Sequence, residues 1–418
     1  MEFIALMLVL IMKLTLQSFP MVCDFKHFAF HFFLGLIFAG CSHAAYKPEF
    51  AADDALLIAD DLNGAPQKNT SAIYRPVEWS EIDGWYDDNH AEALAAFMKS
   101  CKAIAADSLW DRPCFDAAFI DENDTFSARI FFESRFQPYE IIADGNERRG
   151  LITGYYIPIL EGSREKTERF KYPIYKRPSD LVLVDLASFG ADRKYARGIL
   201  GKNGIVTPYP YDREAIETNA SLLKGSEIFY VDDPIALFFM HIQGSGLIKV
   251  GNKTRLVGYA DQNGFSYYAI GKYFVDTGKI SRDNLSMQTI RAWLSAQLAK
   301  NPKRAFEVMW KNRSFIFFEE KDEEGAVGSL GVVLSPKRSI AVDKSFIPLG
   351  SPVFIAGVDE KKEFKLNMRR LIMAQDTGGA IKGAARADFF WGVGREAGKN
   401  AGAMRLYGRF WLLAPKNY

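Results

Sequence analysis

The side chains best suited to chemistry are three aspartates in the C-terminal part of the chain. Asp343, Asp376 and Asp388 each end or interrupt an apolar, strand-like run, and glycines or aromatic residues surround them. We expect carboxyls in such settings to be half-buried, and burial raises the pKa of a carboxyl because it disfavours the charged form. Neighbouring carboxylates raise that pKa again, since like charges oppose a second ionisation. The pattern therefore predicts a carboxylic acid that keeps its proton near neutral pH and acts as a general acid.

The composition argues against the other common catalytic groups. The 418 residues include five histidines and four cysteines, and three of those histidines and two of those cysteines lie in the first 43 positions. Metal clusters and Cys- or His-centred active sites are therefore disfavoured, and we expect neither a metal nor an organic cofactor. The 52 basic and 51 acidic residues give a net charge of +1, which provides no field to attract nucleic acid.

The N-terminal segment has the pattern of a targeting signal. Two apolar runs, 3–12 and 28–40, are each shorter than the roughly 18 to 20 residues that span a bilayer. The second run ends in small residues directly before Cys41, so that LIFAGC resembles a bacterial lipobox. We predict a signal peptide over 1–40 and a lipid anchor on Cys41, at the periplasmic face of the outer membrane of a Gram-negative bacterium. Met21 is an alternative start, and a buried hydrophobic hairpin of the mature fold is the alternative structure.

After this segment the chain begins with a linker and two helices. Residues 41–80 are polar and irregular, as a tether between an anchor and a domain would be. A helix is predicted after Asn89 and another after Asp124, because both residues are suitable N-caps and apolar residues follow at helical spacing. The apolar side of the second helix is expected to comprise Phe126, Ile130 and Phe136.

The remainder is mostly β. The stretch 150–260 contains short β-branched and aromatic runs separated by Gly, Pro and Asp, with one helix between Pro234 and Gly244. Helical spacing returns over 286–312, and from about 328 to the end short strands alternate with glycine-rich turns.

Cys101 and Cys114 are the cysteines that follow Cys41 in the mature chain. An oxidising periplasm would permit a bridge closing the short loop between them. Two buried free thiols are the alternative, and the spacing leaves both open.

The settings of the three aspartates resemble the three-aspartate (3D) domain. Five further segments share the resemblance: TGYYIP (153–158), FFMHIQGSG (238–246), VGYADQNG (257–264), NRSFIFF (312–318) and the WGVGREAGKNAG…YGRFWLL ending. Together, in this order, they resemble a membrane-bound lytic murein transglycosylase of the MltA type over roughly residues 80–415.

The resemblance implies a mainly β fold with flanking helices: a double-psi β-barrel domain with an inserted second β-barrel-like domain. The catalytic domain would comprise residues 81–160 and 260–418, with the 3D region at about 328–415, and the inserted β domain would comprise 161–259. A cleft between the domains would bind the glycan strand of peptidoglycan. Other partners would be the membrane, through Cys41, and other cell-wall enzymes.

The resemblance also implies a reaction, the non-hydrolytic cleavage of the β-1,4 bond between N-acetylmuramic acid and N-acetylglucosamine. Asp388 would protonate the glycosidic oxygen and then accept the proton of the muramic acid 6-hydroxyl, giving a 1,6-anhydro product. Asp376 would support Asp388, and Asp343 is the third catalytic candidate. Phe389 is an expected sugar-stacking ring. The candidate substrate-binding residues are Thr153, Gly154, Tyr155, Tyr156, Gln243, Ser245, Tyr259, Gly378, Gly379, Lys382 and Trp391.

Simpler interpretations remain for several of these features. Asp343 is equally a turn residue, His241 a core histidine, and the Gln243–Ser245 turn a helix C-cap. Glu133, in ESRFQP, resembles the catalytic glutamate of lysozyme-like transglycosylases, but the companion motifs are missing and a structural role is expected. The single Asp-Thr-Gly triplet at Asp376 does not suffice for an aspartic protease, which needs two.

Two alternative functions also stay open. One is a hydrolytic muramidase that uses Asp388 with a second carboxylate. The other is a non-catalytic wall-binding lipoprotein, for which Asp388 would be dispensable.

Overall fold

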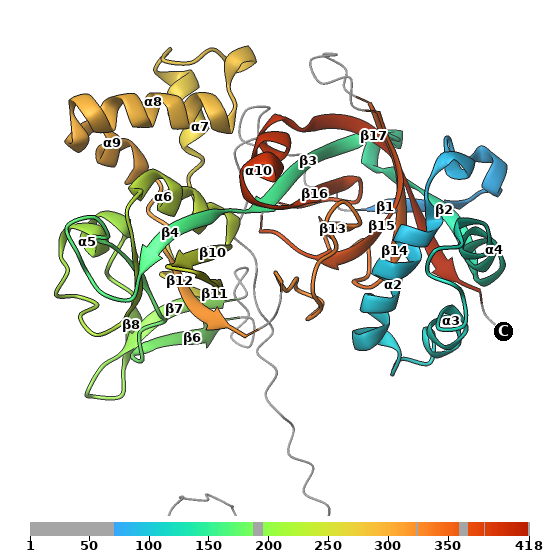
Figure 1. Ribbon diagram of the computed structural model, residues 1–418, viewed down its shortest axis with the longest axis horizontal. Coiled ribbons are helices and arrows are strands. Elements are labelled where there is room, and N and C mark those ends of the chain that lie inside the picture. Colours follow the sequence, from blue (N-terminus) through green and yellow to red (C-terminus); the bar gives the residue numbers. More distant parts are fainter. Residues whose placement is uncertain (1–70, 187–194, 323–324, 359–366, 380, 417–418) are drawn as a thin grey trace, which may run out of the picture. The chain divides into compact units, whose positions relative to one another are not determined.

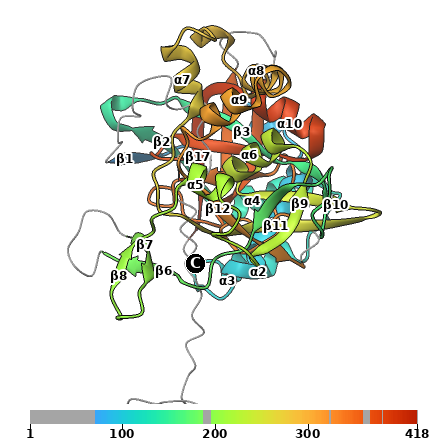
Figure 2. The same ribbon diagram turned by 90° about the vertical axis from the view of Figure 1, so that its left-hand side faces the viewer.

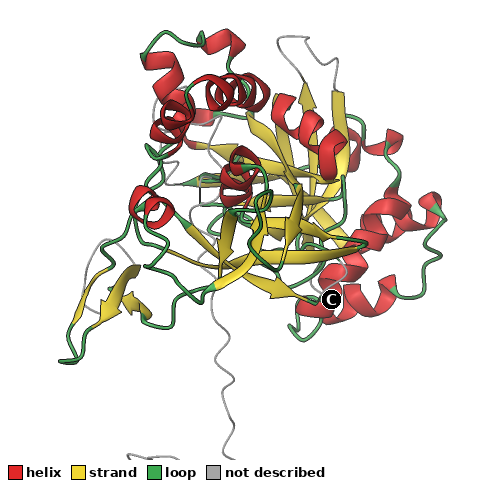
Figure 3. Ribbon diagram, turned by 60° about the vertical axis from the view of Figure 1, so that its left-hand side comes forward, coloured by secondary structure: helices red, strands yellow, loops and turns green. Residues whose placement is uncertain are grey.

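The structure is a computed structural model that describes residues 71–186, 195–322, 325–358, 367–379 and 381–416. The predicted signal peptide, the Cys41 anchor and most of the linker lie outside these residues. Within them, strands predominate and helices pack around them (Figure 3), so the predicted mainly β class with flanking helices is confirmed. No helix in the described ranges is long and apolar enough to cross a membrane.

The first sheet closes into a barrel (Figure 1). Its strands lie in the order β1-β2-β17-β14-β15-β13-β16-β3, and β17 also pairs with β3, which closes the ring from β17 to β3. Strand pairs β13–β15 and β16–β3 are parallel. The bounds are β1 Ala72–Pro76, β2 Phe136–Ala143, β3 Gly150–Ile157, β13 Ser339–Val342, β14 Pro352–Val358, β15 Asn367–Asp376, β16 Arg386–Val393 and β17 Arg405–Pro415. The closed barrel agrees with the expected architecture, while its double-psi connection remains a prediction.

The barrel encloses an apolar core. Side chains from its strands meet inside it, among them Ile152, Ile340, Val342, Phe389 and Phe410, all 2% exposed or less. Since neighbours along a strand point to opposite faces, the residues between these point outward. That alternation decides on which side of the barrel wall each candidate residue lies.

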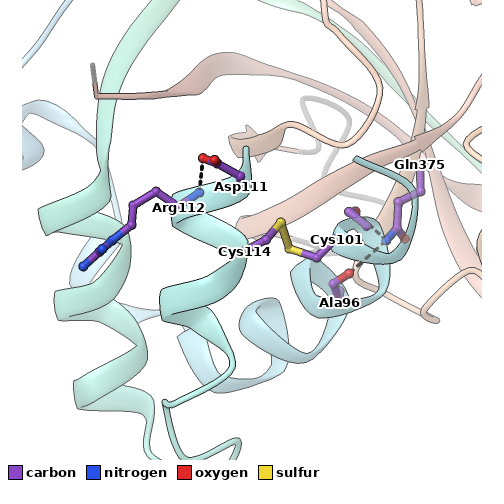
Figure 4. Close-up of a disulfide and its surroundings, with 7 residues drawn as sticks. Ala96, Cys101, Asp111, Arg112, Cys114 and Gln375 are labelled. Carbon is purple, nitrogen blue, oxygen red and sulfur yellow. Dashed lines mark hydrogen bonds between the residues drawn. A yellow bond between two sulfur atoms is a disulfide. The ribbon is translucent and has the colours of Figure 1, made fainter. Parts of the chain in front are cut away.

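Three helices pack against the barrel around Phe97: α2 (His90–Ile104), α3 (Asp111–Ala117) and α4 (Thr125–Arg135). The predicted caps are present, since Asn89 accepts a bond from Glu92 N and Asp124 accepts bonds from the first turn of α4. Cys101 of α2 and Cys114 of α3 form a disulfide with a Cα–Cα distance of 5.5 Å (Figure 4). Of the two alternatives that the spacing left open, the structure therefore has the disulfide and not two free thiols.

The predicted apolar face of α4 is wrong in part. Phe126 and Ile130 are 61% and 43% exposed, whereas Ala128, Phe131 and Phe132 are buried. Phe136 is buried, but as the first residue of β2. The buried face of α4 is therefore rotated about the helix axis from the predicted one, because Phe131 and Phe132 pack against the ring of Phe97.

A second, six-stranded sheet has the order β12-β11-β10-β4-β9-β5. Its strands are β4 Ile159–Ser163, β5 Tyr172–Tyr175, β9 Glu227–Val231, β10 Ser245–Val250, β11 Lys253–Gln262 and β12 Ile316–Lys321, so the sheet extends past 161–259. Figure 2 shows the small antiparallel sheet of β6 (Leu181–Asp185), β7 (Tyr195–Leu200) and β8 (Val206–Pro208). Helices α5 (Arg213–Thr218), α6 (Pro234–Gln243), α7 (Ile270–Asp276), α8 (Met287–Lys300) and α9 (Pro302–Met309) complete this part.

Helix α6 forms as its sequence predicts. Asp233 accepts bonds from Ile235 N at 2.8 Å and Ala236 N at 3.0 Å, Pro234 occupies the first turn, and Gly244 ends the helix with φ of 74°. The left-handed conformation at the C-cap favours glycine. This helix fixes the position of Gln243 at its last turn.

Helix α10 (Gly394–Ala403) was not predicted. It contains several glycines, each costing roughly 1 kcal/mol relative to alanine in a helix interior. Packing explains it, because a Cβ on Gly398 would lie 2.6 Å from the ring of Tyr156 on β3. The absence of a side chain lets α10 lie directly on β3 (Figure 1).

Candidate active site

Asp388 lies in a row of paired residues that crosses four strands. Ala341 of β13 is the register partner of both Asp376 on β15 and Asp388 on β16, and Asp388 is in turn the partner of Thr153 on β3. Register partners share a face of a sheet. The sheet therefore brings Asp376, Asp388 and Thr153 onto one surface from distant segments of the chain.

That surface is the outer face of the barrel wall. Tyr155 and Phe390, two positions beyond Thr153 and Asp388, place their ring centroids 5.1 Å apart and pack with Ala341. Phe389, which lies between Asp388 and Phe390 in the sequence, points into the barrel core and is 2% exposed. The expected stacking role of Phe389 therefore conflicts with its position.

The carboxyl of Asp388 is fully buried, with 0% exposure, where the sequence had predicted half-burial. Thr153 Oγ1 donates to Asp388 Oδ1 at 2.6 Å, and Arg386 Nη2 donates to Thr153 Oγ1 at 3.0 Å. Arg386, 7% exposed, thus occupies an acceptor position of the hydroxyl, so that the hydroxyl hydrogen is directed at Asp388. Complete burial favours the neutral form of a carboxyl, and this bond favours the ionised form.

Asp376 is held by four donors at the end of β15. Its Oδ1 accepts from Ser329 N, Ser329 Oγ and Thr377 N, each at 2.9 Å, and its Oδ2 accepts from Tyr155 Oη at 3.0 Å. Desolvation raises the pKa of Asp376, and the bonds from Ser329, Thr377 and Tyr155 partly oppose that rise. Burial, the charge of Asp376 and the hydrogen bond to Asp376 raise the pKa of Tyr155 well above its ordinary value of 10, so Tyr155 stays a donor.

Asp343 has a different environment. Its Oδ1 accepts from Ser345 N at 3.1 Å and its Oδ2 from Gly383 N at 2.9 Å. These bonds organise the turn after β13 and hold the loop that follows β15. Gly378, Gly379 and Lys382 lie in that same loop, the last with an exposed side chain.

Two of the candidate residues on β3 lie beside other elements. Tyr156 points away from Asp388 into the core beneath α6, α8 and α10, and its backbone N–H donates to Gln243 Oε1 at 3.2 Å. Gly154 lies under Trp391, since a Cβ there would be 2.7 Å from Trp391 Nε1. Gln243 therefore links the end of α6 to β3, and Ser245 follows it at the start of β10.

Tyr259 lies on β11 in a polar network that sequence reasoning missed. Its hydroxyl accepts from Arg197 Nη2 at 3.5 Å, and Arg197 Nε and Arg177 Nε both donate to Asp261, at 3.1 and 2.7 Å. Sequence reasoning also missed Ser329, which donates to Asp376, and Arg386, which donates to Thr153. Arg386 could have been found from the sequence, because residues two positions apart on a strand share a face and Arg386 precedes Asp388 by two. Nothing in the sequence pairs Ser329 with Asp376.

The two doubtful candidates have structural partners. Glu133 Oε1 accepts from Trp85 Nε1 at 2.8 Å, within the packing of α4. His241 is 3% exposed, its Nδ1 accepts from Ile316 N at 3.2 Å, and burial together with the Arg213 charge lowers its pKa well below 6.5. In the described part of the chain, no three His, Cys, Asp or Glu residues are grouped so as to hold a metal ion.

Comparison with known proteins places these features in a family. Residues 151–319 match the MltA specific insert domain and residues 338–414 match the 3D domain. The chain is 36% identical over 302 residues to the membrane-bound lytic murein transglycosylase A homolog of Buchnera aphidicola, covering 71% of this chain and 72% of the relative. The chain belongs to the membrane-bound lytic murein transglycosylase A (MltA) family. The resemblance stated from its motifs is thereby confirmed.

Solved MltA structures have the same fold. The crystal structure of MltA from Neisseria gonorrhoeae has a TM-score of 0.72 at 34% identity, covering 84% of this chain and 92% of that one. The E. coli MltA structure with bound chitohexaose has a TM-score of 0.63 at 25% identity, covering 84% of this chain and 93% of that one. An MltA protein thus binds a β-linked N-acetylglucosamine oligomer.

Proposed function

We propose that this chain is a peptidoglycan lytic transglycosylase in which Asp388 is the single acid and base. Its membership of the MltA family supports the activity. The observation that carries the mechanism is one fully buried carboxyl, Asp388, which a hydroxyl donor orients on the face where β3, β13, β15 and β16 meet.

A single carboxyl suffices for this reaction. A hydrolase must activate water or supply a nucleophile, and so needs a second carboxylate at a set separation. A lytic transglycosylase uses the 6-hydroxyl of its own substrate, which is already positioned and acts at high effective concentration. The remaining need is an acid that begins protonated, and the buried Asp388 meets it.

The steps balance without water. Because Thr153 donates to Oδ1, the proton of the acid is carried on Asp388 Oδ2. That proton passes to the glycosidic oxygen as the bond from this oxygen to C1 of N-acetylmuramic acid breaks. The 6-hydroxyl then attacks C1 and returns its proton to Oδ2. The products are a free N-acetylglucosamine 4-hydroxyl and a 1,6-anhydromuramic acid end, and Asp388 is protonated again.

Asp376 acts as a positioning residue in this scheme. Its carboxyl fixes Tyr155, which packs against Phe390 beside Asp388. The negative charge of an ionised Asp376 also opposes the ionisation of Asp388. Both effects help to keep the acid protonated and in place.

The location of the protein belongs to the same proposal. The relatives from Vibrio cholerae and E. coli are named membrane-bound. Membrane association through a lipid on Cys41, at the periplasmic face of the outer membrane, agrees with these names and with the LIFAGC motif.

Mass spectrometry of digested murein sacculi tests the proposal. The wild type should release anhydro-muropeptides, and Asp388→Asn should release none while still binding sacculi. Glu133→Gln is the matched control, because Glu133 bonds Trp85 away from the row, and its product yield should equal that of the wild type. Products with reducing ends would instead identify a hydrolase. Unchanged cleavage by Asp388→Asn would exclude Asp388 as the acid.

A further inference from the structure

A second candidate binding site lies in the part of the chain that carries the six-stranded sheet. A cavity of about 200 Å³ opens between β5 and α9. Aromatic side chains form most of its wall, and they come from β5, from α9 and the residue after it, and from the residue before β12: Tyr172, Tyr175, Phe306, Trp310 and Phe315. None of the barrel strands that hold Asp388 and its partners contributes to this lining.

Three of the rings form a continuous surface. The ring centroids of Phe306 and Trp310 are 5.7 Å apart with planes inclined by 34°, and those of Tyr172 and Phe306 are 6.3 Å apart with planes inclined by 37°. All three side chains are partly exposed, so a ligand can reach their faces. Partly exposed rings beside a few fixed polar groups are typical of small-ligand sites.

The polar group of this cavity is the carboxylate of Glu217, which is fixed from two sides. Trp310 Nε1 donates to its Oε2 at 2.8 Å, and Arg213 Nη1 donates to its Oε1 at 3.0 Å. Arg213 is 1% exposed and also donates to the backbone oxygens of Asn312 and Ser314. Because Arg213 is itself immobilised, the Glu217 carboxylate forms a rigid acceptor in the wall.

The charges decide which ligand suits the cavity. Glu217 is the charged residue of the lining, and the buried Arg213 offsets it, so the cavity attracts neither an anion nor a cation strongly. An uncharged ligand with one apolar face and several hydroxyl or amide donors matches rings on one side and a fixed carboxylate on the other. An amino sugar ring has this chemistry, and its size suits the volume.

We propose that this cavity binds one N-acetylhexosamine unit of a glycan strand, as a second murein contact separate from the site of Asp388. The ligand class rests on the proposed function, since it is the polymer on which this family acts. The pyranose lies against Phe306 and Trp310, and its hydroxyls donate to Glu217. The contact retains the enzyme on insoluble murein between cleavage events.

Co-sedimentation with sacculi tests this site. Every variant is made in an Asp388→Asn background, so that no strand is cleaved during the measurement. Trp310→Ala should weaken sacculus binding by about fivefold, the size of a lost stacking contact. Glu217→Gln, which preserves shape, should weaken binding less, and Phe119→Ala, a 73% exposed ring on the other part of the chain, should leave it unchanged. Equal binding by the Asp388→Asn chain with and without Trp310→Ala would overturn the proposal.

A second measurement covers the case in which Trp310→Ala folds poorly. Titration calorimetry of the Asp388→Asn chain with chitotetraose should give two sites per chain, and Trp310→Phe, which keeps a ring but loses the donor to Glu217, should weaken one of them. A single site in both proteins would overturn the inference. So would binding that depends on Trp310 only while the sacculi keep their peptide stems, since the occupant would then be peptide.

The two proposals fail separately. With Asp388 intact, a wild type that releases no anhydro-muropeptides contradicts the proposed function whatever Trp310 does. A wild type that releases them, together with unchanged sacculus binding by Trp310→Ala, contradicts the second site alone.

Discussion

Replacing Thr153 by valine should change the pH dependence of cleavage. The substitution keeps the shape of the side chain and removes the hydroxyl that donates to Asp388 Oδ1 at 2.6 Å. The donor favours the ionised carboxylate, so without it Asp388 keeps its proton to a higher pH. An acid that must start protonated gives an activity that falls as pH rises, and this alkaline limb should therefore move to higher pH.

The size of the shift follows from the bond. Both partners are buried, with Thr153 6% and Asp388 0% exposed, so solvent screening is small. A hydrogen bond to a charged group contributes roughly 1.5–3 kcal/mol, and one pH unit corresponds to about 1.4 kcal/mol. The alkaline limb should move upward by roughly one to two pH units.

The assay is kcat/KM for anhydro-muropeptide release between about pH 4 and pH 9, the range that brackets titrating carboxyls. Thr153→Ser is the matched control, because it keeps the hydroxyl and should keep the wild-type limb. The reasoning is refuted if the valine variant remains active with an unshifted limb. It is also refuted if serine and valine shift the limb equally, since a purely structural effect would then be the cause.

Three further predictions concern neighbouring parts of the fold. Tyr155→Phe removes the donor to Asp376 Oδ2, so the pKa of Asp376 should rise further, and kcat should fall by about tenfold with little change in KM. Reducing the Cys101–Cys114 disulfide, whose cysteines are 13 positions apart, should lower the free energy of unfolding by roughly 2–4 kcal/mol, seen as a lower Tm in thermal unfolding with dithiothreitol. Gly398→Ala should cost about 1–3 kcal/mol in denaturant unfolding, because its Cβ would overlap an aromatic ring of β3, and wild-type stability would disprove that close packing.

The local features of the fold could be predicted from local sequence signals. Asn89, Asp124 and Pro234 mark helix starts because caps depend on residues within one turn. The face of α4 could not be predicted in the same way. Phe126 and Ile130 have helical spacing, yet the burial of a face depends on Phe97, which comes from another helix.

Helix α10 also could not be predicted from local sequence, because the contact that stabilises it comes from a distant strand. The low helix propensity of its glycines predicts a loop. Only the structure shows that Gly398 lacks a side chain where the helix packs against the ring of Tyr156, a residue of β3 that is remote in sequence. Propensity is a weak guide wherever close backbone approach stabilises an element. A residue chosen for contact with a distant element thus carries a misleading local signal.

The candidate site combines both situations. Strand-end aspartates among glycines and aromatic rings pointed to Asp388, and the resemblance to the MltA family named it. Its full burial and its bond to Thr153, 235 positions earlier, depend on the parallel pairing of β16 with β3. That pairing exists because the barrel closes, and closure is a property of register between strands rather than of any one strand.

The same register accounts for Arg386. Two residues along β16 return a side chain to the same face, so Arg386 and Asp388 both face Thr153 once β3 is paired beside them. A strand that must present a buried acid thereby also presents the guanidinium that orients the donor to that acid. Moving Arg386 by one position would turn it into the barrel core and leave the Thr153 hydroxyl without that restraint. The spacing of two between these residues is thus a requirement of the sheet geometry, and it is the feature of RADFFWG that connects its sequence to the proposed chemistry.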